Sequence, residues 1–100
     1  MATCFESIDK ESITTLVFPK SDVLSKKEAI QQRIDELKLA LSFGNLDYFK
    51  IKIYFEDNQS KKVVEATVCG VTNKRVIINR GIGIPINRIY RTLSFIIKLG

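Results

Sequence analysis

The sequence contains no histidine and no tryptophan, and only two of its 100 residues are cysteine. Histidine is the commonest general acid or base near neutral pH and the commonest metal ligand, so its absence excludes catalytic triads and histidine-based zinc sites. Cys4 and Cys69 lie 65 positions apart, which fits neither a CxxC metal site nor a disulfide framework. We therefore expect no enzymatic activity, no metal and no cofactor, and two free thiols in a reducing cytoplasm.

Long apolar runs are also missing. No segment approaches the ~20 apolar residues that a membrane helix needs, and the first residues, MATCFESIDKES, lack the features of a signal peptide. With 45% apolar and 27% charged residues, the composition is that of a small globular domain. We expect a cytoplasmic protein without a membrane partner, with one domain at residues 25–100.

Residues 1–24 show no clean apolar period. An apolar cluster at residues 13–18, closed by Pro19, predicts either a short strand laid against the domain or a flexible N-terminal arm. A helix is predicted next, at about residues 26–42. Ser25 and Glu28 have the spacing of a capping box, and Gly44 can end the helix in a left-handed conformation. The apolar stripe of this helix consists of Ile30, Ile34, Leu37 and Leu41.

From Phe49 onward the apolar period changes to two, which is typical of strands with one buried face. The alternation predicts strands at residues 49–56, 64–68, 75–79 and 82–86, and a last strand from residue 89. The turn cluster at residues 57–60 makes the first two strands a hairpin, and Gly70 interrupts the alternation as a bulge or sharp bend would.

Five short strands at such close spacing predict a small antiparallel barrel, because parallel crossovers need connections of about a dozen residues or more. We therefore expect an α+β fold, in which one N-terminal helix packs on a five-stranded antiparallel SH3-like (Sm-like) small barrel.

Three segments carry a resemblance: GNLDYFKIKIYFED, VVEATVCGVTNKRVIIN and GIGIPINRI. The stretch from about Lys27 to Ile89 that contains them is similar to a family of small uncharacterised bacterial proteins with a helix, a GN turn and an IPI-x-RI ending. The architecture resembles Sm-like and SH3-like small barrels. Because Sm-like barrels commonly bind single-stranded nucleic acid and assemble edge to edge into rings, this resemblance implies a nucleic-acid ligand and a homo-oligomer. It implies no catalytic residue.

Positive charge is concentrated in the second half of the chain. Residues 1–49 carry six basic and eight acidic side chains, whereas residues 50–100 carry ten basic and three acidic ones. Basic clusters can neutralise phosphates, and tyrosines among them can stack on unpaired bases. The candidate nucleic-acid-binding residues are Lys50, Lys52, Tyr54, Lys74, Arg75, Arg80, Arg88, Tyr90 and Arg91.

Two alternatives stay open. A solvated strand face must be polar, and lysines on strand edges prevent edge-to-edge pairing, so the basic residues can serve solubility instead. Residues 93–100 have apolar side chains at both odd and even positions, so both faces of a strand there would be apolar. Residues 13–18 or another subunit should therefore cover them. The second hypothesis is therefore a protein-interaction or regulatory subunit that uses this C-terminal strand and the helix in a homo-oligomer.

Overall fold

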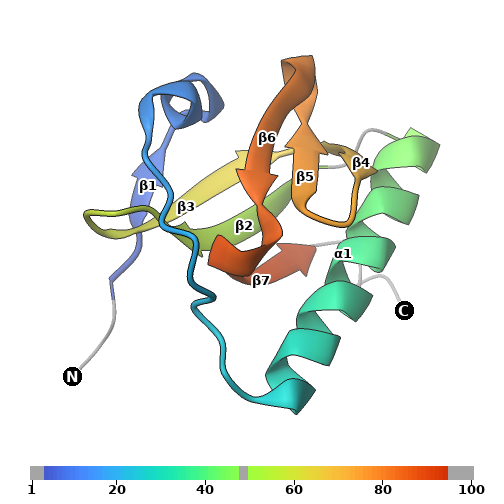
Figure 1. The fold of residues 1–100 in the computed structure, drawn as a ribbon. Coiled ribbons are helices and arrows are strands. Elements are labelled where there is room, and N and C mark those ends of the chain that lie inside the picture. Colours follow the sequence, from blue (N-terminus) through green and yellow to red (C-terminus); the bar gives the residue numbers. More distant parts are fainter. Residues whose placement is uncertain (1–3, 48–49, 95–100) are drawn as a thin grey trace.

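The structure is a computed structural model, and it describes residues 4–47 and 50–94. Within these residues the chain forms one α-helix and seven strands in two sheets, so the fold is α+β (Figure 1). The elements in chain order are β1 (Glu6–Ile8), the 3-10 helix η1 (Lys10–Thr15), α1 (Lys27–Asp47), β2 (Ile51–Glu56), β3 (Lys61–Ala66), β4 (Val68–Val71), β5 (Arg75–Ile78), η2 (Asn79–Gly81), β6 (Ile82–Pro85), η3 (Ile86–Arg88) and β7 (Ile89–Ser94).

The two sheets are joined by a very short connection between consecutive strands. The first sheet has the strand order β1-β3-β2-β7 and the second has the order β4-β5-β6. Since β3 ends at Ala66 and β4 begins at Val68, the chain passes between the sheets through Thr67 alone. The Thr67 backbone N–H donates to the side-chain oxygen of Asn79 at 2.9 Å, which fixes this crossing point against the residue that follows β5.

The hairpin of β2 and β3 confirms the predicted one, and the two strands pair along their whole lengths. Asp57 begins its turn and is 3% exposed. Its carboxylate accepts the backbone N–H groups of Gln59 and Ser60 and a hydrogen bond from the Lys62 ammonium, at 2.9 to 3.0 Å. Burial alone raises the pKa of Asp57, but these hydrogen bonds outweigh burial and hold the pKa below its ordinary value of 3.8. The turn is thus built around an ionised, buried carboxylate.

The interruption at Gly70 is confirmed as a change of register. Val68 lies opposite Ile78, but Gly70 lies opposite Ile77, so Cys69 is an extra residue in β4. Val68 is buried and Cys69 is exposed. The strand therefore bends where it enters the second sheet.

The core lies between the two sheets and takes its side chains from both. Alternate residues of a strand point to opposite faces, so the period of two directs one set of apolar side chains inward. The largest fully buried side chains from the strands are Phe55, Ile51, Ile53, Ile78, Ile84, Ile89, Val64, Val68 and Val76. Ile13 of η1 and Leu37 and Ala40 of α1 complete the buried cluster.

The two sheets do not close into the predicted five-stranded barrel within the residues described. α1 packs against β4 of the second sheet and β7 of the first. The strands from β2 onward do pair antiparallel, as predicted. The one parallel pairing comes from β1, which the apolar pattern did not predict and which pairs with β3.

The helix begins where it was predicted, without the predicted cap, and it ends later than predicted. It begins at Lys27, where the Ile30 N–H donates to the Lys26 carbonyl at 3.0 Å, and no capping bond from Ser25 occurs among the hydrogen bonds of the described residues. It continues through Gly44 to Asp47 instead of ending near residue 42. A helical glycine costs only about 1 kcal/mol relative to alanine, which is too little to stop a helix by itself.

The N-terminal cluster at residues 13–18 begins in a 3-10 helix and continues without a strand. Ile13 lies in η1 and is buried, and the strand of this region is β1, earlier in the chain. Residues 16–24, here called the strap, then cross the front of the molecule from η1 to α1 (Figure 1).

Candidate binding groove

The strap is held to the domain by backbone hydrogen bonds. The Asn58 N–H in the β2–β3 turn donates to the Val17 carbonyl at 2.9 Å, and the Val23 N–H donates to the Asn87 carbonyl in η3 at 2.9 Å. The Asn87 side-chain amide also donates to the carbonyl of Lys20. Segments 41 to 67 positions apart in the sequence are thereby fixed side by side.

Arg88 is a structural residue of this attachment. It is 6% exposed, and its guanidinium donates to the carbonyl of Glu56 at 3.0 Å and to the carbonyl of Ser21 at 2.9 Å. The predicted role of Arg88 at the surface needs an exposed guanidinium, and the structure places this group inside, between the strap and the end of β2. The sequence could not indicate this because the partners are distant carbonyl groups.

Arg33 ties the other end of the strap to α1. Its guanidinium donates to both carboxylate oxygens of Asp22, at 2.9 and 2.8 Å, and to the Ile89 carbonyl at 3.0 Å. Arg33 is 4% exposed. Its hydrogen bonds to the Asp22 carboxylate hold the pKa of Asp22 below 3.8, although partial burial acts in the opposite direction. The Arg33–Asp22 pair therefore fixes the strap in one position against the helix.

A groove of about 1480 Å³ opens between the strap, β6 with its flanking turns, and α1. Its floor is aliphatic. The half-buried side chains that a ligand can reach there are Leu16, Phe18, Ile34, Ile82 and Ile86. The volume exceeds the ~300–1,000 Å³ of ordinary small-molecule pockets, so the groove can hold an extended segment.

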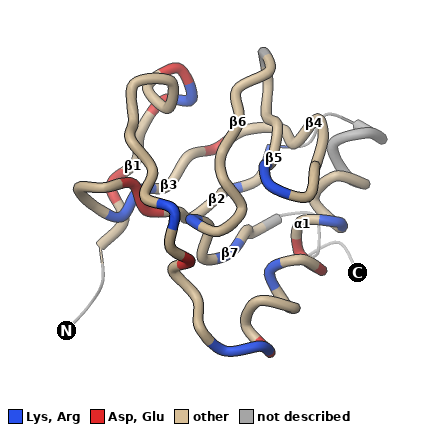
Figure 2. The backbone as a smooth tube through the Cα atoms, viewed as in Figure 1, with Lys and Arg blue, Asp and Glu red and all other residues tan. Residues whose placement is uncertain are grey.

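Four exposed basic residues border this floor: Lys20 on the strap, Lys38 on α1, and Lys74 and Arg75 at the start of β5. Figure 2 shows in blue where Lys and Arg occur along the backbone. None of the four forms an ion pair within residues 4–47 and 50–94. The acidic residue in the lining, Asp22, is already paired with Arg33. The border of the groove therefore carries positive charge that nothing in the described chain neutralises.

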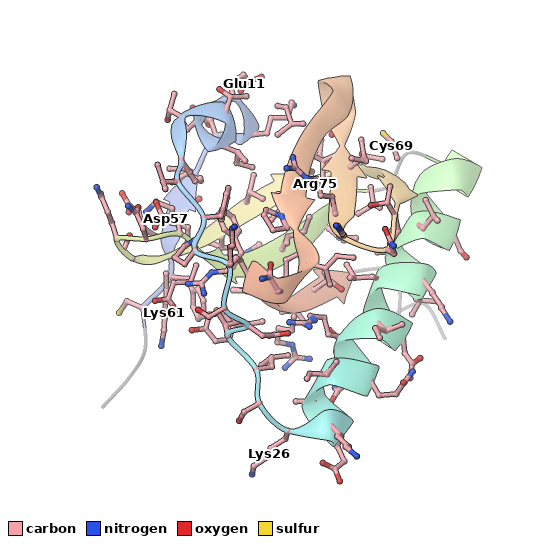
Figure 3. All side chains as sticks on the ribbon, viewed as in Figure 1. Glu11, Lys26, Asp57, Lys61, Cys69 and Arg75 are labelled. Atoms are coloured by element: carbon pink, nitrogen blue, oxygen red, sulfur yellow. The ribbon has the colours of Figure 1, made fainter. Side chains whose placement is uncertain are left out.

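The Arg75 side chain lies across β6 (Figure 3). A Cβ atom placed on Gly83 would lie 3.2 Å from the Arg75 Cδ atom, so the absence of a side chain at Gly83 gives this arginine its path. The Arg75 side chain therefore passes close to the neighbouring strand β6.

The predicted residues whose side chains the structure describes do not form one surface. Lys74 and Arg75 line the groove. Tyr54 and Tyr90 lie on the outer face of the first sheet, where both contact the Phe5 ring edge-on, with centroids 5.0 and 5.8 Å apart. The Tyr90 hydroxyl donates to the Glu56 carboxylate. These tyrosines are half-buried and lie outside the groove, so they offer it no stacking ring.

The remaining predicted residues are dispersed. Arg91 is exposed and pairs with Glu36 on α1 at 3.6 Å. Lys50 is exposed just before β2, and Lys52 is half-buried on β2. Arg80 lies in η2, and its side chain is outside the part of the chain that the structure describes.

Sequence reasoning missed Lys20, Lys38 and Arg33. Arg33 could have been found, because it lies three positions after Ile30 and four before Leu37, inside the apolar stripe of the helix. A charged residue at such a position is expected to be buried with a partner. Nothing in the local sequence distinguishes Lys20 or Lys38 from other surface lysines.

Within residues 4–47 and 50–94 no cluster of three or more histidine, cysteine or acidic residues could hold a metal ion. Among the same residues, no helix has both the length and the apolar character needed to span a membrane. Both cysteines are free and exposed. Of the predicted apolar C-terminal strand, Leu93 is 38% exposed and residues 95–100 lie outside the described part.

Comparisons of this chain with protein-family models, with curated proteins and with solved structures found no match.

Proposed function

We propose that this protein is a non-catalytic binding module whose groove holds an extended anionic ligand, for which the sequence suggests single-stranded nucleic acid. The observation that carries the proposal is the set of exposed lysines and one arginine, without ion-pair partners among described residues, around an aliphatic floor. Unpaired cations beside an apolar surface attract a ligand that has both charge and apolar groups.

The proposal changes the location of the predicted site. Arg88 is buried and the tyrosines lie on another face, so the groove relies on Lys74 and Arg75 from the predicted set and on Lys20 and Lys38. Phosphates bound at these four positions would release counterions, and the affinity would fall as salt rises.

The likeness to SH3-like barrels stays a proposal about the fold. It is supported by the connection at Thr67, where the chain passes from β3 of the first sheet to β4 of the second. It is also supported by the 3-10 helix η3 directly before β7. We propose that the two sheets are the halves of an open small barrel, an architecture that presents binding surfaces in many unrelated proteins.

The test is fluorescence anisotropy with a labelled single-stranded oligonucleotide and a labelled acidic peptide at two salt concentrations. The variant is the double charge reversal of Lys74→Glu and Arg75→Glu. The matched control is Lys26→Glu with Lys27→Glu, an equal change of charge on exposed residues; Lys26 lies far from Arg75 (Figure 3). We expect the first variant to weaken binding and, for a single strand, to lower the salt slope by about 1.4 for two lost phosphate contacts.

Equal affinities of the two variants for every probe, or no binding to either probe at low salt, would overturn this proposal. A check of thermal unfolding for both variants separates loss of the site from loss of the fold.

The protein-interaction hypothesis is a second candidate. Leu39 of α1 is 45% exposed and Leu93 of β7 is 38% exposed, and these two elements pack on each other. The test is a variant that lacks residues 95–100, in which β7 keeps the bounds described above. If the mass of the particle in solution, measured by light scattering, differs from that of the full chain, self-association is assigned to that segment. An unchanged mass in a folded protein excludes that segment as the interface.

A further inference from the structure

We infer that the ligand of the groove is an extended peptide segment with carboxylates beside aliphatic side chains, which pairs with the free edge of β6. This inference rests on the proposed function, because it names the ligand class for the same groove. A peptide ligand would contact the protein through its backbone amides and aliphatic side chains. A nucleic-acid ligand would contact it through phosphates and bases.

The edge of β6 is the first argument. β6 is the last strand of its sheet and pairs with β5 on one side. The Ile86 N–H donates to the Lys74 carbonyl at 2.9 Å, and bonded and non-bonded pairs alternate along an antiparallel ladder. In this register Ile84 belongs to a hydrogen-bonded pair and Gly83 belongs to a non-hydrogen-bonded pair. The Gly83 N–H and C=O therefore point away from β5. Neither group has a hydrogen-bond partner among the described residues.

Across the groove, the strap faces β6, and η1 also packs against β6. Gly83 and Ile82 line the groove on the β6 side, and Leu16 and Phe18 line it on the side of the strap. A paired strand lies about 4.8 Å from its neighbour, and an added strand obtains its affinity from main-chain hydrogen bonds.

The floor favours aliphatic side chains over bases. Phe18 is the one aromatic residue among the described lining residues, and its ring packs on the Phe55 ring at 6.0 Å between centroids. Proteins that bind single strands without sequence preference present aromatic rings on which successive bases stack. This groove instead presents isoleucine and leucine, which suit branched aliphatic side chains.

The charge at the border selects an acidic peptide. Side chains of a strand alternate between two faces, so a peptide on β6 can direct one set to the floor and the other to Lys74 and Arg75. A Cβ atom on Gly83 would lie 3.2 Å from the Arg75 Cδ atom and 3.5 Å from a guanidinium nitrogen of Arg75. A peptide residue paired with Gly83 therefore has a guanidinium next to its carboxylate.

The decisive variant is Gly83→Pro, which removes the N–H that a peptide would use. Ile82 has φ −74° and ψ 130°, a conformation that a residue before proline adopts readily. The matched control is Gly83→Ala, which keeps the N–H and introduces the same Cβ atom near Arg75. Equal thermal unfolding of the two variants shows that both keep the fold.

The probes are a labelled octapeptide that alternates Glu with Val, the same peptide with Lys in place of Glu, and a single-stranded octanucleotide. We expect the acidic peptide to bind, the basic peptide not to bind, and Gly83→Pro to bind the acidic peptide about threefold to tenfold more weakly than Gly83→Ala, the effect of one lost hydrogen bond.

Equal affinities of Gly83→Pro and Gly83→Ala would overturn the pairing with β6. If the oligonucleotide binds, the Lys74 and Arg75 reversal abolishes that binding, and the acidic peptide does not bind, the peptide inference fails while the proposed function stands. If that reversal changes nothing for any probe, both fail.

Discussion

The carboxylate of Glu36 on α1 accepts the backbone N–H of Thr92 on β7, at 3.0 Å. Three residues earlier on the helix, Arg33 donates to the Ile89 carbonyl at 3.0 Å. β7 pairs with β2 on one side, and these side chains satisfy backbone groups that a further strand would otherwise bond. The helix thus protects the described part of this edge against strand addition.

Replacement of Glu36 by alanine should destabilise the protein by about 1–3 kcal/mol, because Thr92 is 7% exposed and its N–H would lose its acceptor. The Glu36→Gln variant keeps an acceptor oxygen and should lose less. The measurement is the free energy of unfolding from urea titrations. Asp35→Ala, which removes only an exposed bond to Gln31, is the control. Equal stability of Glu36→Ala and Asp35→Ala would show that the edge bond contributes nothing.

Acid should destabilise the protein through Asp22 and Asp57. Both pKa values lie below 3.8 in the folded state, so the unfolded chain binds protons first as pH falls. The stabilisation is fully present above about pH 5 and is lost as pH falls through 3.8 and then through the folded-state pKa values. Urea midpoints measured between neutral and acidic pH should show this decline.

The Asp57→Asn variant should make that decline shallower and should also lower stability at neutral pH, because Lys62, 7% exposed, loses its 3.0 Å ion pair with Asp57 and keeps only the 4.0 Å ion pair with Glu6. Glu65→Gln on the exposed face of β3 is the control. A decline in Asp57→Asn as steep as in the control would contradict the role of Asp57.

Tyr90 should titrate at unusually high pH. Burial and its hydrogen bond to the Glu56 carboxylate raise the pKa of Tyr90 from 10.0 to about 12. The neutral phenol is favoured by the folded state, so this stabilisation is present below about pH 10 and is lost as pH rises toward about 12. Tyrosinate absorbance should lose its latest step in Tyr90→Phe and keep it in Tyr54→Phe. A missing step in both variants, or in neither, would refute this assignment.

Gly81 should be costly to replace for backbone reasons alone. It has φ 76° in the turn before β6, and a Cβ atom there would have nothing within 4 Å. Gly81→Ala should therefore lose about 1–2 kcal/mol of unfolding free energy through left-handed strain. Gly81→Asn should lose less, because asparagine tolerates this conformation. Gly70→Ala, where a Cβ atom makes an ordinary contact of 3.8 Å to Ile77, is the control and should lose less than Gly81→Ala.

The strands were predictable because their signal is local. A period of two in the apolar residues indicates which face of a strand is buried, whatever it packs against, and it marked the β2–β3 hairpin and the irregularity at Gly70 correctly. The sequence did not indicate β1, because two exposed residues and one half-buried residue, paired in parallel with a distant strand, carry no periodic signal.

The candidate groove was predictable only in part. Lys74 and Arg75 were selected for their charge and do line it, whereas Arg88, selected on the same basis, is a buried link to the strap. Whether a strand residue has an odd or even position predicts which face of the sheet its side chain lies on, but it does not predict what that side chain contacts. Whether an arginine binds a ligand or a backbone carbonyl of its own chain is settled by residues far away in the sequence.

The sequence by itself determined the α+β class, the alternation that defines the inner face of each strand, and the bend into the second sheet, because these follow from the spacing of neighbouring residues. Only the tertiary structure decided that the strap crosses to α1, that the helix bonds to the edge of β7, and that unpaired cations from three segments surround one groove. Those outcomes depend on contacts between residues far apart in the chain, and no local period encodes which distant groups meet.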